Sequence, residues 1–349
     1  MKRFFSSCMG PGIRFGAIAF LALLMGGFVL VTKVSAKTIS LNYANFPPAP
    51  TFPCVQMEQW KAEVEKKTNG AVRINTFPGG TLVDAKEMMD GVIAGQADIG
   101  CLCMAYQPGR FTLTNAVSLP LGIPNSKVGS LVLTDIFNEF KPKAFDRVKV
   151  LALFTSAPAS IMSRKRVAAL EDIAGMDLRA SGGAAEILKA WGANQIGMPM
   201  SATPEALQKG VVQGLFSSLE VMKDLKFAEE CPYVTLTNTV VYPFAVVMNL
   251  NRWKALPPEV KAVMDALSRP QALWTGTYMD NHVSEAVEWS KKTHGVEVVE
   301  LDDSTSAVWN NALSPITQRW ITVATGQGFD GKAIVDTILR LVDLHTKGE

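Results

Sequence analysis

The sequence has few of the residues on which metal centres and disulfide scaffolds depend. It contains 5 Cys and 3 His in 349 residues, and its three histidines are scattered singly. His282 and His294 are predicted on or near one helix, where twelve residues span about 18 Å, so they cannot bind a single atom. The low counts argue against a histidine-based metal site and against a disulfide-rich scaffold.

Motifs for nucleotide binding and catalysis are also missing. Neither a phosphate loop nor G-x-G-x-x-G follows any predicted strand, and G-x-S-x-G and H-E-x-x-H do not occur. The hydroxyls of Ser217 and Ser218 are candidate nucleophiles, but the sequence offers no base to activate them. A net charge of +2 gives no reason to expect a nucleic-acid partner. We therefore expect no catalytic residue, no metal and no cofactor, and the protein is not expected to be an enzyme.

What the chain does have is the composition of a folded protein. It is 48% hydrophobic and 19% charged, without a low-complexity run, which excludes disordered, collagen-like and coiled-coil classes. Its length suffices for two or more hydrophobic cores.

The N-terminus carries the one long apolar run. Residues 15–32 contain no ionisable side chain, Lys2, Arg3 and Arg14 precede them, and small residues stand at Val34 and Ala36. This order predicts a signal peptide over residues 1–36 and therefore a periplasmic protein. A retained membrane anchor is the alternative, since 18 residues nearly span a bilayer. Removing residues 1–36 takes away four basic and no acidic residues, so the net charge changes from +2 to −2.

Four cysteines remain after that removal. Outside the cytoplasm thiols tend to oxidise, and an even number permits disulfides. Cys101 and Cys103 share one face of a predicted strand, which holds their side chains parallel and too far apart to bond with each other. A bond from Cys54 to either Cys101 or Cys103 is favoured over metal binding by the C-x-C pair.

Hydrophobic periodicity predicts an α/β protein. Strands are expected at 38–44, 72–77 and 97–103, with helices at 54–68 and 84–94 between them, which is the order of a parallel sheet with right-handed crossovers. Further strands and helices alternate from 148 to 249. Beyond residue 257 the chain is mainly helical, with one strand at 296–301. The pattern favours two α/β lobes between which the chain crosses more than once, with ligands bound at the strand ends.

Six motifs occur in a fixed order over more than 170 residues. They are Phe77–Leu82 (FPGGTL), Gly91–Ile99 (GVIAGQADI), Leu170–Arg179 (LEDIAGMDLR), Gly192-Ala193 with Met198-Pro199, Ala206–Gly214 (ALQKGVVQG) and Trp253–Pro257 (WKALP). Together they resemble the solute-binding subunit of a tripartite ATP-independent periplasmic (TRAP) transporter, of the dicarboxylate-receptor (DctP) type. The resemblance covers essentially the whole chain after the signal peptide.

The resemblance implies a fold and a function. The fold is the two-lobed periplasmic binding fold, with crossing strands and a long helix that spans both lobes. Lobe one would comprise 37–156 plus about 245–284, and lobe two 157–244 plus about 285–349. The subunit would capture a small organic carboxylate and deliver it to a small and a large integral membrane subunit. It would act mostly as a monomer, although some relatives form dimers.

The resemblance also assigns site residues. Arg179 would grip the ligand carboxylate in a two-pronged salt bridge, for which a planar, always charged guanidinium is suited. Further ligand-binding positions are implied at Asn45, Cys103, Met200, Phe216, Ser217 and Tyr242, and a Cys54–Cys103 disulfide would form part of the pocket wall.

Two positions depart from the family pattern. Ser217 stands where many relatives have an asparagine that touches the carboxylate. Ala159 stands where sialic-acid-binding members have a second arginine. Together with Met200 and Phe216, these departures favour a less polar ligand, namely a 2-oxo, aliphatic or aromatic acid.

Two other functions remain open from the sequence. One is a binding protein that reports to a sensor or chemoreceptor. The other is a secreted hydrolase or lyase on a two-lobed scaffold, which would need an acid/base pair in the cleft.

Overall fold

A computed structural model describes residues 38–348, so the expected signal peptide lies outside the described residues. The first of two sheets has the strand order β2-β1-β3-β10-β4. Its strands are β1 (Ile39–Asn45), β2 (Val72–Phe77), β3 (Ile99–Cys103), β4 (Val148–Thr155) and β10 (Pro243–Asn249). β1 pairs in parallel with β2 and β3, as expected, whereas β10 runs antiparallel between β3 and β4.

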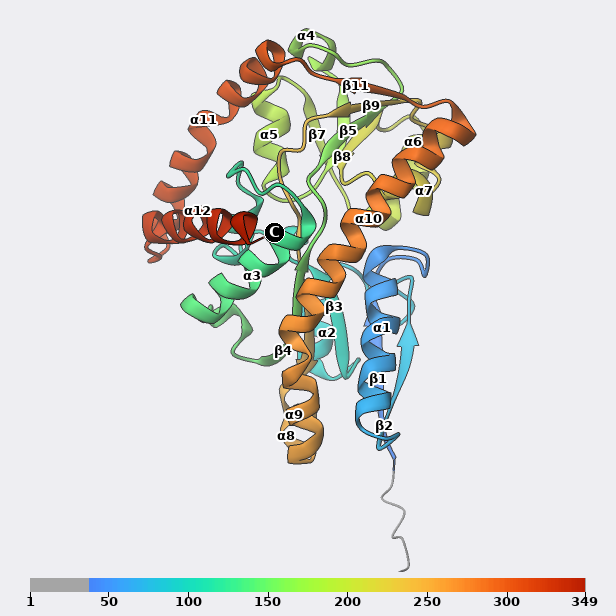
Figure 1. Ribbon diagram of the computed structural model, residues 1–349, viewed down its shortest axis with the longest axis vertical. Helices are drawn as coiled ribbons and strands as arrows, with labels where there is room; N and C mark the ends of the chain where they lie inside the picture. Colours follow the sequence, from blue (N-terminus) through green and yellow to red (C-terminus); the bar gives the residue numbers. More distant parts are fainter. Residues whose placement is uncertain (1–37, 349) are drawn as a thin grey trace, which may run out of the picture. The chain divides into compact units, whose positions relative to one another are not determined.

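The second sheet has the order β11-β9-β5-β8-β6-β7. Its strands are β5 (Ser160–Ser163), β6 (Asp177–Ala180), β7 (Asn194–Gly197), β8 (Gly214–Ser217), β9 (Tyr233–Leu236) and β11 (Glu297–Glu300). Two separate mixed sheets confirm the predicted two-lobed α/β architecture (Figure 1).

Two of the segments in which the chain crosses between the sheets lie side by side. One joins β4 to β5 and the other joins β9 to β10. They are hydrogen-bonded to each other: Ser156 N donates to Tyr242 O over 2.9 Å, and Ala159 N donates to Val240 O over 2.7 Å. This paired connection is one of the covalent links between the lobes; the chain also crosses later, between β10 of the first sheet and β11 of the second.

Short helices flank each sheet. In lobe one they are α1 (Phe52–Lys67), α2 (Met88–Ala94), α3 (Ser126–Phe140), α8 (Leu250–Ala255) and α9 (Pro258–Ala266), and in lobe two α4 (Leu170–Ile173), α5 (Ala184–Ala190), α6 (Thr203–Gln208) and α7 (Val221–Asp224). α1 shows why such segments form: Met57, Trp60 and Val64 recur at helical spacing and are buried. The Trp60 ring packs edge-on against Tyr43 of β1, with centroids 5.9 Å apart.

The long helix α10 (Ser268–His294) contacts both lobes, through α3 and β4 of the first and α7 of the second. Figure 1 shows it running from the α9 end of lobe one to the β11 edge of lobe two. Asp280 on α10 accepts hydrogen bonds from the backbone N–H groups of Ser126 (2.7 Å) and Lys127 (3.0 Å) at the N-terminus of α3. Gly276, one turn earlier, lets the two helix backbones approach.

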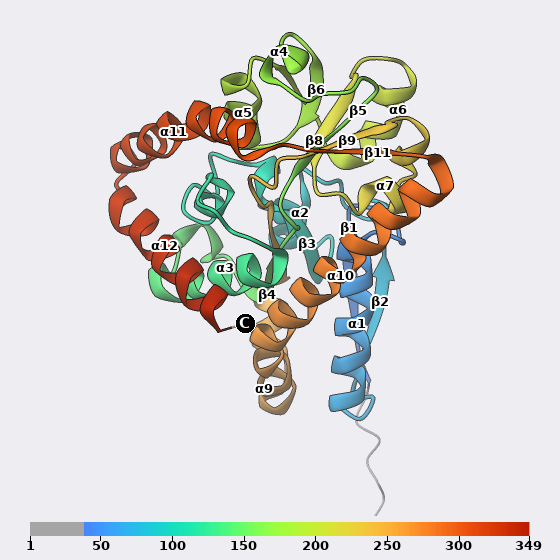
Figure 2. The same ribbon diagram turned by 45° about the horizontal axis from the view of Figure 1, so that its top comes forward.

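The C-terminal helices divide between the lobes. α11 (Asp303–Gly326) contacts α5 of lobe two, whereas α12 (Gly331–Lys347) returns to α3 of lobe one (Figure 2). The buried residues Ile334, Ile338 and Leu341 form the apolar stripe of α12. His345 Nε2 lies 2.8 Å from Asp135 Oδ2 of α3. The expected assignment of 285–349 to lobe two therefore does not hold for α12, because its apolar stripe is buried against lobe one.

Within residues 38–348, none of the helices combines the length and the apolar character that crossing a membrane requires.

We predict that Gly276→Ala destabilises the protein by about 1–3 kcal/mol. A Cβ at this position would lie 2.5 Å from Lys127 Cα and 2.9 Å from Ser126 O, which are backbone atoms that cannot move aside. Urea denaturation of both proteins measures the difference. Gly326→Ala is the matched control: no atom lies within 4 Å of a Cβ there, and alanine favours helix, so no loss of stability is expected. Equal stability of the two variants would contradict the close contact between α10 and α3.

Candidate functional site

A cavity lies between the lobes, the kind of place where small-molecule sites commonly occur. Both lobes and the crossing segments line it. Lobe one contributes Phe46, Pro47, Thr51, Phe52, Pro53, Cys103, Tyr106 and Phe244; lobe two contributes Arg179, Ser181, Met200, Ser217, Ser218, Glu220, Val221 and Leu225; the crossing segments contribute Ser156 and Tyr242.

The lobe-one wall of the cavity is aromatic. Phe52 meets Phe244 edge-on with centroids 5.2 Å apart, and Phe46 stacks parallel to Phe244 at 6.3 Å. Tyr106 packs edge-on against Phe46 at 5.4 Å. Such a wall offers ring faces and edges to an apolar or aromatic ligand.

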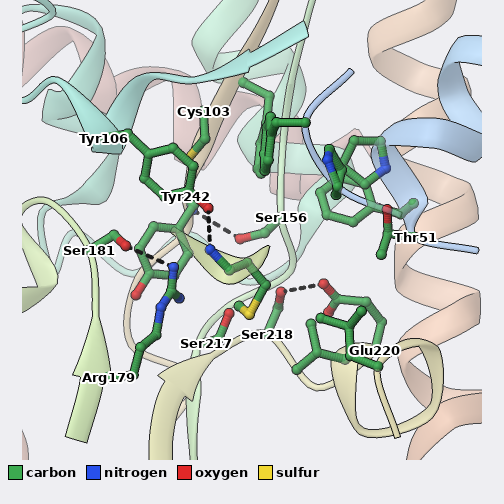
Figure 3. Close-up of a pocket in the computed structure, with 18 residues that line it drawn as sticks. Thr51, Cys103, Tyr106, Ser156, Arg179, Ser181, Ser217, Ser218, Glu220 and Tyr242 are labelled. Carbon is green, nitrogen blue, oxygen red and sulfur yellow. Dashed lines mark hydrogen bonds between the residues drawn. The ribbon is translucent and has the colours of Figure 1, made fainter. Parts of the chain in front are cut away.

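Arg179 stands at the other wall, on the strand next to the edge of the second sheet. It belongs to β6, which pairs with β7 and β8, and its side chain is only 2% exposed. Its Nε and Nη2 donate to the Met198 carbonyl over 3.1 and 2.9 Å, and Nη2 also donates to Ser181 Oγ over 2.9 Å (Figure 3). Among residues 38–348 no carboxylate forms an ion pair with it.

The partners of Arg179 are therefore neutral acceptors that orient the guanidinium without cancelling its charge. Three of its five N–H groups serve these bonds, and the Tyr106 hydroxyl is a further neutral hydrogen-bonding partner. A buried charge that lacks an opposite charge is costly, and a bound anion relieves that cost. The arrangement is suited to holding a carboxylate.

Two tyrosines, the partly buried Tyr106 and the buried Tyr242, border the guanidinium. The Tyr106 hydroxyl accepts a hydrogen bond from Met200 N over 3.0 Å, and the Tyr242 hydroxyl donates to Phe216 O over 2.9 Å. Burial raises the pKa of Tyr106 to about 12 and also raises the pKa of Tyr242, while the nearby Arg179 charge opposes both shifts. Both side chains are therefore neutral hydrogen-bonding groups at physiological pH.

Five of the residues expected in the site line this cavity: Arg179, Cys103, Met200, Ser217 and Tyr242. The other two lie behind its wall. Asn45 is fully buried and bonds the wall loop instead, donating from Nδ2 to Pro53 O (2.8 Å) and accepting from Phe46 N (3.0 Å). Phe216 is likewise fully buried and packs against Trp191, with centroids 5.4 Å apart.

The expected Cys54–Cys103 disulfide is not formed. All four cysteines of the described chain are free and buried. The Cys54 thiol donates to the Pro47 carbonyl over 3.2 Å, which holds it at the start of α1. Cys103 lines the cavity as a thiol, and burial raises the pKa of both thiols to about 12.

Glu220 is the most informative residue that the sequence did not reveal. Its side chain lines the cavity and is 3% exposed, and its Oε1 accepts a hydrogen bond from Ser218 Oγ over 3.0 Å (Figure 3). Burial raises its pKa to about 7, and the Asp224 carboxylate adds to that shift. The only signal in the sequence is an acidic side chain three residues after the apolar strand that ends at Ser217.

Within the described residues no group of three His, Cys, Asp or Glu side chains is arranged to hold a metal ion. The cavity instead combines one buried cation, one buried carboxyl group, several hydroxyls and an aromatic wall. This is the chemistry of non-covalent binding of a small organic anion.

Two lobes joined by crossing segments around such a cavity define a solute-binding protein. Residues 47–322 match the model of the bacterial extracellular solute-binding protein family 7, DctP. The chain belongs to this family, whose structural relatives are TRAP transporter solute-binding proteins.

Three relatives illustrate the similarity. A TRAP periplasmic solute-binding protein from Desulfovibrio salexigens, described as an open complex, is 51% identical, with a TM-score of 0.78 over 87% of this chain and 95% of its own. A marine metagenome protein specific for aromatic acids, with bound metahydroxyphenylacetate, is 27% identical, with a TM-score of 0.84 over 87% and 98%. The C4-dicarboxylate-binding protein DctB of Bacillus subtilis is 25% identical over 74% of this chain and 75% of its own.

Of the two solved structures, the one with the higher sequence identity has the lower TM-score. The ligand-bound relative superposes better than the open complex, although it is far less similar in sequence.

We predict that all four cysteines of a protein lacking residues 1–36 are reduced. Iodoacetamide in denaturant without reductant is expected to modify four thiols, because Cys54 bonds the Pro47 carbonyl and none of the four is paired. Intact mass spectrometry counts the additions, and a sample reduced beforehand is the control. Two additions instead of four would show that a disulfide forms.

We predict that Glu220→Gln becomes more stable relative to the unchanged protein as pH rises. The folded protein holds the Glu220 proton more tightly than the unfolded chain, because burial raises the carboxyl pKa from 4.5 to about 7. Stability is therefore lost as pH increases through this range, by about 3 kcal/mol between pH 4.5 and 8. Urea denaturation at several pH values measures it. A stability difference between the two proteins that does not change with pH would contradict the raised pKa.

Proposed function

We propose that this protein captures a small, weakly polar organic carboxylate in the periplasm and delivers it to the two membrane subunits of a TRAP transporter. The main support for this proposal is the buried Arg179 guanidinium. Neutral acceptors orient it, and it has no carboxylate partner in the described chain. Residues 1–36 would direct export as a cleaved signal peptide.

The cavity walls support an aromatic or aliphatic acid as the ligand. With the carboxylate at Arg179, the rest of the ligand would contact the ring faces and edges of Phe46, Phe52 and Phe244. A relative that is 27% identical is described as specific for aromatic acids. Met200, Ser217, Cys103 and Tyr242 would complete the contacts around the carboxylate end.

We also propose that the protein binds its ligand without transforming it. The cavity contains one carboxyl group, Glu220, and no second titratable group within hydrogen-bonding distance that would serve as its catalytic partner in the described chain. General acid–base chemistry needs a proton donor and acceptor placed around one reacting bond.

We predict that Arg179→Lys lowers the affinity for carboxylates by about 10–100-fold, because a charged, two-pronged hydrogen bond contributes about 1.5–3 kcal/mol. Thermal-shift titrations with 3-hydroxyphenylacetate, phenylacetate, 4-methyl-2-oxopentanoate and gluconate measure it. A ligand at about 100 times its dissociation constant should stabilise the unchanged protein by about 2.7 kcal/mol.

Arg166→Lys is the matched control, because Arg166 is exposed and pairs with Glu297 on the surface. It should bind as the unchanged protein does. Undiminished binding by Arg179→Lys would remove the basis of the proposal, and stabilisation by gluconate alone would overturn the weakly polar ligand class.

A further inference from the structure

Glu220 places a buried carboxyl group in the ligand cavity. This group has no role in the binding of a carboxylate by Arg179. Figure 3 shows Arg179 on one side of the cavity and Glu220 on the other, with Ser217 and Ser218 between them. Within the described chain the two side chains form no ion pair. Each is therefore available to a different part of a bound molecule.

One oxygen of Glu220 lacks a partner. Oε1 accepts the Ser218 hydroxyl, whereas Oε2 is buried and has no hydrogen bond to any described residue. An unsatisfied buried acceptor costs about 1–3 kcal/mol, and native proteins seldom tolerate one without a function. Because the residue lines the cavity, a molecule bound there is in a position to satisfy it.

The neighbouring charges do not neutralise Glu220. His282 of α10, when protonated, opposes the rise in the Glu220 pKa, but its Nε2 lies 2.7 Å from Asp224 Oδ1 and its Nδ1 lies 3.8 Å from Glu285. His282 is thus already paired with two other carboxylates, and Asp224 repels a charge on Glu220. A hydrogen-bond donor from the ligand is the missing interaction.

We propose that Glu220 is a specificity-determining residue that accepts a hydrogen bond from a hydroxyl or ammonium group at the end of the ligand remote from its carboxylate. The inference rests on the proposed function and narrows it: the ligand is a weakly polar acid that carries a distal hydrogen-bond donor. A site built to bond such a group discriminates strongly against the analogue that lacks it, because its own polar atom is then left unpaired.

The test compares matched ligands by isothermal titration calorimetry at pH 7.5. The set is phenylacetate, its 3-hydroxy and 4-hydroxy derivatives, and 3-(aminomethyl)phenylacetate, so that hydroxyl and ammonium donors are separated. The unchanged protein should bind at least one donor-bearing acid tenfold or more tightly than phenylacetate. In Glu220→Met, which keeps the length of the side chain but removes its acceptors, that ratio should fall below threefold. Glu229→Gln, an exposed neighbour, should keep the full ratio.

A second measurement covers the case in which Glu220→Met does not fold. The carboxyl carbon of Glu220 is followed by ¹³C NMR in the unchanged protein as pH is varied. A donor-bearing acid should lower the Glu220 titration midpoint relative to phenylacetate, because a bond to the charged form favours ionisation.

The outcomes separate the two proposals. Carboxylate binding that depends on Arg179 but shows no preference for a donor would overturn the role of Glu220 and leave the proposed function intact. A preference that persists in Glu220→Met, or an unmoved titration midpoint, would also overturn it, since water or another group would then satisfy Oε2. Absence of binding by every acid would overturn the proposed function itself.

Discussion

The structure depends on one buried positive charge whose hydrogen-bonding partners are all neutral. Arg179 is fixed by the Met198 carbonyl and the Ser181 hydroxyl, so its guanidinium has a defined direction before any ligand arrives. An acidic partner would have stabilised the empty protein, but a ligand would then have to displace it. Neutral acceptors give orientation without competition, and they leave the charge to attract an anion.

This constraint explains why the cavity needs both lobes. An ion pair is weak in water and strong where water is excluded, and the lobe-one aromatic wall supplies that exclusion. The lobes approach closely beside Arg179: a Cβ on Gly182, which has φ +57°, would lie 2.9 Å from the Ala105 carbonyl oxygen. Exclusion of water by the two lobes therefore strengthens the interaction of the guanidinium with an anion.

The sequence predicted the parts of the fold that depend on local periodicity and on the family motifs. The parallel β1-β2-β3 arrangement and Arg179 near the end of a strand follow from such patterns. Alternation along β8 also explains one difference: Phe216 and Ser217 are consecutive, so their side chains point to opposite faces, and only Ser217 lines the cavity. Asn45 and Cys54 bond backbone carbonyls of their own loop, which depends on loop geometry that residue spacing does not encode.

Glu220 escaped prediction for a related reason. It stands just before α7, a four-residue helix, and only the turn after β8 brings it to the cavity. Its position also limits what the cavity can accept. If Glu220 lay beside Arg179, it would neutralise the guanidinium. Because serines and apolar side chains separate the two, the cavity has one end that favours an anionic group and another that favours a hydrogen-bond donor. A molecule that satisfies both must have an anionic group at one end and a donor at the other, and its length must match their separation.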